Sequence, residues 1–479
     1  MSLSSGLQNR YMASTYDELA TRLSREISTT PCEETLYTEM ISRKRFIPAG
    51  NTLLAGKQPI RPNCAILPAI TAENAQYIVK RSIKLWTERI GIGFDASQHP
   101  DPVYILRKLS EANASIDLGH RPQRGNMCVV DIIHPRIGEF ITCKSNENSV
   151  YSDGTPAPPL YNFNISVGLR KADLTNPLYK DTLALMASSA WKSGDPGIVF
   201  LDAVGSVPDE LGNGENVALP HLGRATTLVP CGEQAMFPNE VCTLGSLNLA
   251  CPDFWIPATS SSPPLFNGDC FGQTVKLAVR FLDSVIDQMT MCDPELEAMA
   301  KQTRRIGLGI MGFAAVVAAQ GLTYNDPRVT ILIDQIGSVY RDKSHQASRE
   351  LAVENGPCPA LIGTGVCRRN ITVTCIAPTG GITLLTGNGA YGIEPFFTDA
   401  NKLTISEHMI VQARWQLYVD NCISKTINLP THATIDDIST AWHTAAEMGL
   451  KSVTVYRNGS HLNQPMVVDP SCPSGSCTI

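Results

Sequence analysis

Three observations predict an α/β fold. Between residues 46 and 200, short apolar runs such as CAILPAI, CVVDII and FNISVGL alternate with longer amphipathic stretches such as AENAQYIVKRSIKLWTERI. Strand-like runs resume at ITVTCIA and SVTVY, after two long helical stretches. A length of 479 residues corresponds to about three domains of roughly 150 residues each, or to one large α/β barrel. Alternation of strands and helices along a chain favours the α/β class.

The first element expected along the chain is a short helical cap over residues 1–45. Within this stretch Tyr16, Leu19 and Leu23 recur at a spacing of three to four residues, with charged residues between them. Gly, Pro and Asn then mark the loops, because these residues interrupt helices and strands. The other expected elements are two long helices (273–305 and 328–354), two loops (207–227 and 257–267) and a flexible tail (458–479).

The composition describes a globular chain that does not bind nucleic-acid polymers. Hydrophobic residues make up 43% and charged residues 18% of the chain, which excludes a disordered or coiled-coil protein. The 39 basic and 45 acidic residues sum to a net charge of −6, so no global basic field attracts DNA or RNA. Any nucleic-acid chemistry therefore concerns small nucleotides.

The chain is expected to be soluble and cytoplasmic, with no membrane contact. The sequence has no run of about eighteen apolar residues, and its start, MSLSSGLQNRYMASTYDEL, lacks the apolar centre of a secretory signal. Fifteen cysteines in such a chain predict reduced and partly reactive thiols rather than a disulfide scaffold.

Two cysteines stand close to the end of the sequence. The stretch Cys472-Pro-Ser-Gly-Ser-Cys477 lets two sulfurs meet on an accessible segment, which suits a carrier of reducing equivalents. The alternative is an incidental pair in a tail without function. A zinc site is disfavoured, because two ligands fall short of the usual four.

A second reactive group surrounds Cys231. In VPCGEQ, Cys231 stands two residues before Glu233, in a turn set by Pro230 and Gly232, and Cys242 follows in VCTLGSLNLA. Such a turn brings a thiol and a base within reach of one substrate. These residues alone leave an ordinary surface turn open as the alternative.

Three glycine-rich motifs bear on nucleotide binding. GLGIMG (307–312) and GNGAYG (387–392) match GxGxxG, but their flanking sequences do not fit a strand-to-helix turn, so both predict packing or turn glycines rather than a Rossmann site. The missing GxxxxGK[ST] pattern excludes a P-loop enzyme. APTGGIT (377–383) follows a predicted strand and precedes a helix start, where backbone N–H groups favour a phosphate. An ordinary strand-to-helix turn is the open alternative.

Ten segments of the chain resemble, in the same order, those of the catalytic (large, alpha) chain of ribonucleotide reductase. The resemblance implies a ten-stranded α/β barrel of two five-stranded halves over residues 46–457, with a central finger loop that presents one cysteine. It also implies an enzyme, a ribonucleoside-diphosphate reductase, that makes deoxyribonucleotides for DNA synthesis. The segments are RFIPAGNTLLAG, NCAILP, NMCVVDIIHPRIGEFITCK, YNFNISV, GDPGIVFLD, PCGEQ with VCTLGSLNL, RRIGLGIMGFA, APTGGIT, YGIEPFF and KSVTVYRNGS.

The resemblance assigns a role to each reactive residue. Cys231 is implied as the finger-loop cysteine, which becomes a thiyl radical and takes the hydrogen from C3′ of the ribonucleotide. Glu233 is implied as the base on the 3′-hydroxyl. Cys64 and Cys242 are implied to supply the reducing electrons and to close to a disulfide as the 2′-hydroxyl leaves as water. The two tail cysteines are implied to reduce that pair, and thioredoxin or glutaredoxin resets them.

The resemblance also implies residues that hold the substrate and an effector. Relatives have asparagine where this chain has Val229, and Asn164 is the expected substitute for the missing amide. A deoxynucleotide or ATP effector is implied at residues 106–124, where it selects the substrate base. No ATP-cone domain fits ahead of Phe46, so inhibition by dATP through such a domain is not expected. The implied substrate residues are Asn51, Thr52, Asn63, Asn164, Thr379, Gly380, Gly381 and Ile382, and the implied effector residues are Ser110, Gly119, Arg121 and Arg124.

The resemblance leaves two sources for the radical. KSVTVYRNGS resembles adenosylcobalamin-dependent members, whereas the cysteine-ended tail resembles members that work with a separate di-metal radical subunit. Tyr456 stands where the latter have a tyrosine pair, with Val455 in the other place, and is implied in radical transfer. The resemblance favours the partner subunit, with adenosylcobalamin as the alternative. The chain itself is expected to hold no tightly bound cofactor and no metal.

A homodimer is expected, because the specificity site of many relatives lies where helices pair across two chains. The short length resembles that of compact viral members. Two other functions stay open. One is a non-catalytic nucleotide-binding homologue with a regulatory role, suggested by Val229. The other is a general thiol oxidoreductase, which the missing CxxC disfavours.

Overall fold

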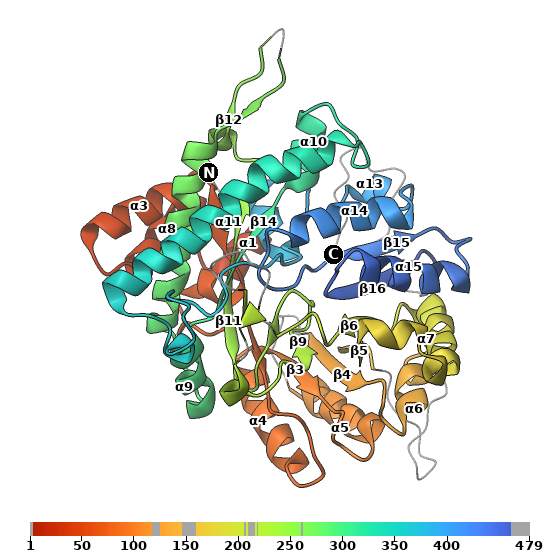
Figure 1. The fold of residues 1–479 in the computed structure, drawn as a ribbon. Coiled ribbons are helices and arrows are strands. Elements are labelled where there is room, and N and C mark those ends of the chain that lie inside the picture. Colours follow the sequence, from red (N-terminus) through yellow and green to blue (C-terminus); the bar gives the residue numbers. More distant parts are fainter. Residues whose placement is uncertain are drawn as a thin grey trace.

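A ten-stranded sheet forms the centre of the molecule, and helices pack around it (Figure 1). The structure is a computed structural model that describes residues 3–116, 125–145, 160–205, 207–208, 216–217, 219–259 and 262–460. Strands and helices alternate along much of the chain, so the predicted α/β class is confirmed.

Five parallel strands connected by helices make one half of the sheet. Each connection passes through a helix, because parallel neighbours require a long crossover. These strands are buried along nearly their whole length, which explains their continuous apolar sequences and confirms the three predicted runs. The elements are β2 (Cys64–Ile66), α4 (Ala75–Thr87), β3 (Gly91–Asp95), α5 (Pro102–Ala114), β4 (Asn126–Asp131), α6 (Ile137–Thr142), β5 (Phe163–Leu169), α7 (Lys180–Ser193) and β6 (Gly197–Phe200).

The sheet continues from both edges of this half. β11 (Val241–Asn248) runs antiparallel to β2, and β16 (Ser452–Arg457) runs antiparallel to β6. β1 (Phe46–Pro48) and β14 (Ile306–Met311) flank β11, and β15 (Thr426–Leu429) pairs in parallel with β16. The order is therefore β1-β11-β2-β3-β4-β5-β6-β16-β15, with β14 also on β11.

The predicted strand at ITVTCIA forms two isolated bridges rather than a continuous ladder. Thr374 bridges to Leu308 of β14, and Ile376 bridges to Ile423, three residues before β15. A strand is assigned only where consecutive residues pair with a neighbouring strand. Here the N–H of Val373 donates to the side-chain carboxylate of Asp420 instead of to a backbone carbonyl of another strand. The apolar pattern therefore identified an extended segment, but it did not predict how the backbone pairs.

The long helix predicted over residues 273–305 is two helices. Asp293 accepts a hydrogen bond from Leu296 N at 3.1 Å, which starts a new helix at Pro294. The prediction over residues 328–354 is confirmed by a helix that ends one residue later. The helices of this part are α8 (Gly268–Gln288), α9 (Pro294–Thr303), α10 (Phe313–Ala319), α11 (Arg328–Asn355), α12 (Gly380–Thr386), α13 (Phe397–Ala400), α14 (Ile405–Gln416) and α15 (Ile435–Glu447).

The N-terminal residues form three helices. The first of them ends before Tyr16, where the periodic apolar pattern of the sequence begins. Thr30 caps the third helix through its side chain, which accepts a hydrogen bond from Glu33 N, so the second and third helices are separate. Tyr37 packs edge-on against Phe281 of α8, with ring centroids 5.1 Å apart. The helices of the cap are α1 (Ser5–Tyr11), α2 (Tyr16–Ile27) and α3 (Pro31–Ser42).

The first stretch predicted as a loop, 207–227, contains a short antiparallel pair, and a second such pair joins the strand just before the predicted loop 257–267 to one near its end. Each pair has two residues per strand and lies outside the main sheet. The pairs are β7 (Val207–Pro208) with β8 (Asn216–Val217), and β12 (Trp255–Ile256) with β13 (Leu265–Phe266).

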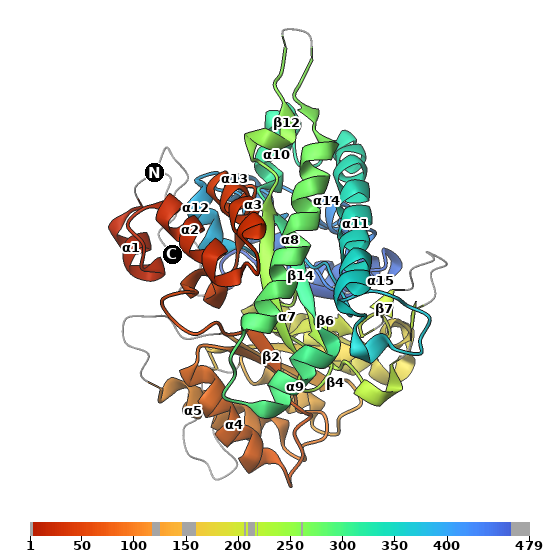
Figure 2. The same cartoon turned by 90° about the vertical axis from the view of Figure 1, so that its left-hand side faces the viewer.

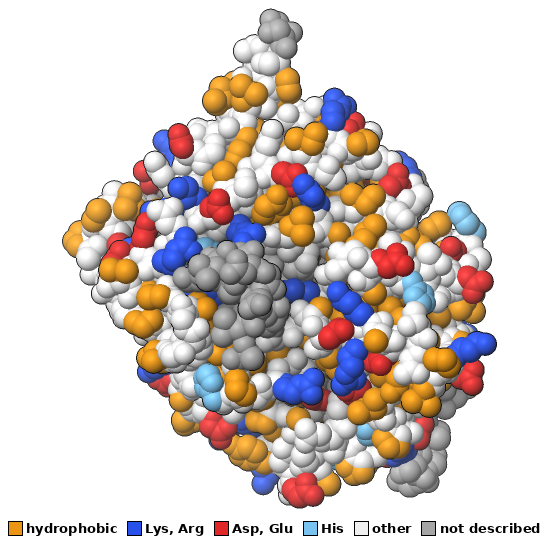
Figure 3. All heavy atoms as spheres, viewed as in Figure 1, with side chains coloured by type: hydrophobic (Ala, Val, Ile, Leu, Met, Phe, Trp, Pro, Cys, Tyr) orange, Lys and Arg blue, Asp and Glu red, His pale blue; other side chains and the backbone are white. Residues whose placement is uncertain are grey.

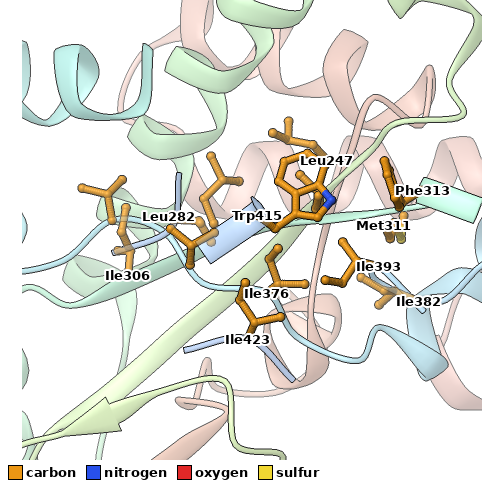
Figure 4. Close-up of a cluster of buried hydrophobic side chains, with 14 of the residues drawn as sticks. Leu247, Leu282, Ile306, Met311, Phe313, Ile376, Ile382, Ile393, Trp415 and Ile423 are labelled. Carbon is orange, nitrogen blue, oxygen red and sulfur yellow. The ribbon is translucent and has the colours of Figure 1, made fainter. Parts of the chain in front are cut away.

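A buried apolar cluster between β11, β14 and the helices anchors both ends of the segment 377–381 (Figure 4). Ile376, at one end, and Ile382, at the other, point into this cluster, and each is under 5% exposed. Removing such side chains from a close-packed core costs roughly 2–5 kcal/mol. The core therefore fixes the position of the segment that the sequence predicts as a candidate phosphate-binding turn.

The face of the molecule seen in Figure 3 carries side chains of both charge signs, interspersed with apolar ones. This distribution agrees with the small net charge of −6. Among the described residues, none of the helices combines the length and the apolar character that a bilayer crossing requires.

Candidate active site

A short hairpin carries Cys231 at its tip. Its strands are β9 (Thr227–Leu228) and β10 (Ala235–Met236), which pair antiparallel. Gly232 N donates to Val229 O at 2.9 Å and closes the turn. Gly232 has a φ of +80°, a conformation in which a side chain would be strained. The glycine that follows the cysteine is therefore needed for the turn.

The two reactive side chains of this turn lie in different environments. The thiol of Cys231 is exposed, whereas Glu233 is 2% exposed. Burial raises the pKa of Glu233 from 4.5 to about 7. Among the described residues, Glu233 Oε2 has no hydrogen-bond partner. A ligand that donates a hydrogen bond to this oxygen would relieve the cost of burying it unpaired.

The hairpin packs closely against the parallel half of the sheet. A Cβ atom on Gly93 would lie 2.1 Å from Leu228 O, and one on Gly91 would lie 3.1 Å from Pro230 Cγ. Asn164 Nδ2, from β5, donates to Pro230 O at 2.8 Å. Glycines on β3 thus allow the hairpin to approach, and Asn164 holds the residue before Cys231.

The opposite side of the hairpin is held by Asn421 and Cys422. Asn421 Nδ2 donates to Gln234 Oε1 at 2.8 Å, and its Oδ1 accepts from Ala235 N at 2.8 Å. Cys422 N donates to Glu233 O at 3.1 Å. These bonds fix the backbone on both sides of the Glu233 carboxyl.

Cys64 and Cys242 face each other across two strands. They are directly opposite in the antiparallel pairing of β2 with β11, and Asn63 N donates to Cys242 O at 3.1 Å. A hydrogen bond from Cys64 lowers the pKa of Cys242, but burial and the nearby carboxyl of Glu233 outweigh it, so the pKa is raised. A Cβ atom on Gly91 would also lie 3.2 Å from Cys64 Sγ. Cys64 and Cys242 therefore lie beside the turn that carries Cys231 and Glu233.

Val229, which takes the place of the family asparagine, is fully buried in a small apolar cluster. An amide there would need partners that an apolar cluster does not offer. The loss of the asparagine is therefore compatible with the packing, and Asn164 supplies an amide to the next residue of the turn. The other buried members of the cluster are Ile66, Met236, Cys242, Leu244, Cys375 and Ala377.

Two of the implied substrate residues have buried polar atoms without a partner among the described residues. These atoms are Thr52 Oγ1 and Asn63 Nδ2, on side chains that are 0% and 6% exposed. Asn51 differs, because its Nδ2 donates to Pro62 O at 2.9 Å and its N donates to Asn63 Oδ1 at 3.1 Å. A ligand that bonds to these two atoms would relieve the cost of burying them unpaired, and Asn51 orients Asn63.

The segment implied to bind phosphate turns sharply into α12. Thr379 has a φ of +63°, unusual for a residue with a side chain, and its Oγ1 accepts from Gly392 N at 2.8 Å. Gly380 and Gly381 begin the helix, and Ile382 anchors it in the core. Ala377, in the apolar cluster with Cys242, places the start of this segment beside the cysteine pair.

The remaining implied residues are only partly described. Tyr456 lies on β16, and a Cβ atom on Gly194 would be 3.5 Å from its ring. Ser110 Oγ donates to Asn162 Oδ1 at 2.6 Å, which ties α5 to the start of β5. The implied effector residues Gly119, Arg121 and Arg124 and the tail cysteines Cys472 and Cys477 lie outside the described residues.

Sequence reasoning missed residues that hold the hairpin from a distance. Gln234 and Asn421 are 187 positions apart, and Cys375 and Cys422 both lie close enough to Glu233 for its charge to affect them. Burial, above all, raises the pKa of both thiols, that of Cys422 to about 11. Cys375 stood inside a predicted strand, but no local signal marked Asn421.

A cavity of about 350 Å³ lies at the carboxyl ends of β2, β3 and β4, against Thr227 and Met236 of the two hairpin strands. Its walls include Asp95, Asp131 and Arg224, and they do not include Cys231 or Glu233. This cavity therefore borders the hairpin strands without reaching its two reactive side chains. Within the described ranges, no three His, Cys, Asp or Glu side chains are grouped to hold a metal ion.

Comparisons with known proteins connect this arrangement with one family. The family model described as "Ribonucleotide reductase, barrel domain" matches residues 178–365 and 395–456. A vitamin B12-dependent ribonucleoside-diphosphate reductase of Thermoplasma acidophilum is 27% identical, over 92% of this chain and 71% of its own length. A protein of the same name from Mycobacterium tuberculosis is 31% identical, over 76% of this chain and 60% of its own length.

A solved structure shares the fold. The class Id ribonucleotide reductase alpha subunit of Actinobacillus ureae superposes with a TM-score of 0.77, covering 95% of this chain and 96% of that one. The two sequences are 17% identical, so the likeness concerns the fold.

Proposed function

Because the chain belongs to the ribonucleotide reductase family, we propose that it reduces ribonucleotides to 2′-deoxyribonucleotides for DNA synthesis. One observation carries this proposal: the hairpin presents the exposed thiol of Cys231 and a buried carboxyl of pKa about 7 beside two facing cysteines. In this set the thiol of Cys231 accepts a hydrogen atom once it has been oxidised to a radical, and the carboxyl is a base. The two facing cysteines together are a two-electron reductant.

In the proposed reaction, the thiyl radical of Cys231 takes the hydrogen atom from C3′, and Glu233 accepts the proton of the 3′-hydroxyl. The 2′-hydroxyl leaves as water, and Cys64 and Cys242 supply two electrons and two protons as their thiols join in a disulfide. Return of the hydrogen atom from Cys231 to C3′ completes the product and regenerates the radical. One ribonucleotide and two thiols thus give one deoxyribonucleotide, one water and one disulfide.

The burial of Glu233 supports its role as a base. With a pKa of about 7, a substantial fraction is ionised at neutral pH, so the carboxyl can accept the proton and later return it. Cys242 is also fully buried, so water is excluded from this thiol of the reducing pair. Thr52 and Asn63 offer unpartnered polar atoms to the nucleotide, and the Gly380–Gly381 turn is proposed to hold its phosphates.

The bond from Asn164 to the turn leads to a first prediction. Asn164→Ala removes the hydrogen bond to Pro230 O and loosens the position of Cys231, so we expect kcat to fall about tenfold with KM nearly unchanged. Steady-state kinetics of purified variants measure this. Asn176→Ala, at an exposed asparagine that caps a short surface helix, is the control and should behave as wild type. Full turnover in the Asn164 variant would show that this amide does not position the cysteine.

Two radical sources are candidates, each with its own support. Tyr456 on β16 and the cysteine-ended tail favour a separate di-metal radical subunit. The relatives named as vitamin B12-dependent favour adenosylcobalamin, which supplies a carbon-centred radical when bound. The exposure of Cys231 is compatible with either source.

One assay tests the activity and separates these sources. The purified chain is incubated with CDP or CTP, dithiothreitol and a deoxynucleotide effector, with and without adenosylcobalamin. Deoxynucleotide formed only with adenosylcobalamin establishes a self-sufficient reductase. Product that forms only after a di-metal radical subunit is added establishes the partner. A chain that binds nucleotide but turns over under neither condition supports a non-catalytic, regulatory homologue, against which the presence of Cys64, Cys231, Glu233 and Cys242 argues.

The finer features of the fold and assembly belong to the same proposal. We propose that the sheet closes into a ten-stranded barrel, and the bridges of Thr374 and Ile376 between β14 and the segment before β15 support this. The substrate is proposed to be a ribonucleoside diphosphate, after the names of the relatives. A homodimer, an effector site, and reduction by thioredoxin or glutaredoxin stay predictions.

A further inference from the structure

The N-terminal cap reaches the segment that is proposed to hold the substrate's phosphates. Tyr11 Oη, from α1, donates to Gly381 O at 2.9 Å. A Cβ atom on Gly381 would lie 2.9 Å from Arg10 Nη2 and 3.6 Å from Arg10 Cζ. Figure 2 shows α1 beside α12. The guanidinium of Arg10 therefore lies directly against the glycine turn, in space that a side chain on Gly381 would occupy.

Among the described residues, no carboxylate forms an ion pair with Arg10. Within the described residues the guanidinium makes no hydrogen bond, and besides the glycine turn it lies over the ring of Tyr11, 5.6 Å from the centroid. The residue is exposed. A planar guanidinium with five free donors matches the geometry of phosphate oxygens better than that of any neutral group.

A half-buried arginine of the cap, Arg22, fixes α1 in this place. Arg22, from α2, donates through Nη2 to Tyr11 O at 2.8 Å and to Leu53 O at 3.2 Å, and through Nη1 to Ala55 O at 2.8 Å. Leu53 directly follows Thr52, whose buried Oγ1 has no partner among the described residues. The same arginine thus ties α1 to the part of the chain that offers an unpartnered hydroxyl to a ligand.

We propose that Arg10 binds a phosphate group of the nucleotide substrate, so that α1 forms one wall of the substrate site. The inference rests on the proposed function, because it takes the ligand at the glycine turn to be the phosphorylated end of a ribonucleotide. Arg10 contributes to binding and to the preference for phosphorylated nucleosides, and it takes no part in the radical steps.

Binding measurements on the full chain test this assignment. The dissociation constants of CDP and of cytidine are measured by calorimetry for wild type, Arg10→Ala, Arg10→Lys and the control Arg25→Ala. Arg25 is an exposed arginine of the same cap, paired only with Glu34 at the surface. Loss of a charge-assisted contact to phosphate is expected to weaken CDP about tenfold in Arg10→Ala. Arg10→Lys should weaken it about threefold, and Arg25→Ala should leave it unchanged. Cytidine, which lacks phosphate, should bind all four proteins equally.

A second pair of variants separates a direct contact from a structural effect. Gly381→Ala places a methyl group where the guanidinium lies, so it should weaken CDP in the wild-type background and have little further effect in Arg10→Ala. Tyr11→Phe removes the bond that anchors α1 but keeps the guanidinium, and should cost less than Arg10→Ala. Equal weakening of CDP and cytidine by Arg10→Ala would indicate a structural role and overturn the proposal.

The result for wild type shows whether a failure concerns the Arg10 contact or the proposed nucleotide site. If wild type binds CDP more tightly than cytidine and Arg10→Ala keeps that preference, Arg10 is not the phosphate contact, while the proposed function stands. If wild type shows no preference for CDP, the proposed nucleotide site itself is wrong.

Discussion

Cys231→Ser abolishes ribonucleotide reduction while nucleotide binding stays within about twofold of wild type. We expect turnover to fall at least about a thousandfold, because a serine hydroxyl does not yield a radical under conditions that oxidise a thiol. The side chain is exposed at the tip of the hairpin, and the turn depends on Gly232 rather than on the sulfur. The replacement therefore removes chemistry without disturbing the fold.

Product formation and CDP binding, measured on the same preparation, check this prediction. Cys32→Ser is the matched control, since Cys32 is also exposed but lies on α3 of the N-terminal cap. The control should retain full activity. Turnover that survives in Cys231→Ser would remove Cys231 from the radical role and would require another of the thiols near Glu233 to carry it.

Glu233→Gln is the second change with a large expected effect. Loss of the base should lower kcat about a hundredfold to ten-thousandfold. In wild type, the ionised carboxyl is the active form, so activity should rise with pH through about 7, the pKa that burial produces. The residual activity of Glu233→Gln should lose this limb of the pH profile. An unchanged profile in the variant would assign the titration to another group.

The same substitution, which lowers activity, is expected to raise the stability of the folded protein at high pH. The folded-state pKa of Glu233 is raised from 4.5 to about 7, so the folded protein holds its proton more tightly than the unfolded chain does. The stability from this group is complete below pH 4.5 and is lost as pH rises through 7, which amounts to about 3 kcal/mol. Glutamine carries no charge to bury, but it leaves its own amide unpaired, so a net gain of about 1–2 kcal/mol at pH 8 is expected.

Urea unfolding of wild type and Glu233→Gln at pH 5 and pH 8 measures this difference. The variant should be more stable than wild type at pH 8, and the gap should close or reverse at pH 5. A gain of stability together with a loss of activity is the pattern of a group that is strained for catalysis. Equal stability at both values of pH would contradict the raised pKa.

Much of the fold could be predicted from local sequence patterns. Apolar runs of strand length separated by amphipathic stretches identified β2, β4 and β5, and the spacing of Tyr16, Leu19 and Leu23 identified the cap. These predictions succeed because burial on one face of a helix or on both faces of a strand leaves a periodic pattern. Pairing leaves no such pattern, which is why residues 371–377 were predicted as a strand but form only isolated bridges.

The VPCGEQ turn and the resemblance of the surrounding segments pointed to Cys231 and Glu233 as the candidate reactive residues of the hairpin. The resemblance also implied that Cys64 and Cys242 act together, and the structure places them opposite each other across β2 and β11. The environment of Glu233 could not be read from the sequence, because a raised pKa depends on burial, and burial depends on every element packed around the carboxyl.

By itself, the sequence determined the α/β class and the family resemblance, and it named the candidate reactive side chains, since these depend on residue type and local order. Only the tertiary structure decided that the amide of Asn164 binds the backbone of Pro230, which polar atoms of the described residues are buried without partners, and that Arg10 reaches Gly381. Each of these is a contact between residues at least 66 positions apart or a consequence of burial. Such properties arise from packing, and no local pattern in the chain encodes them.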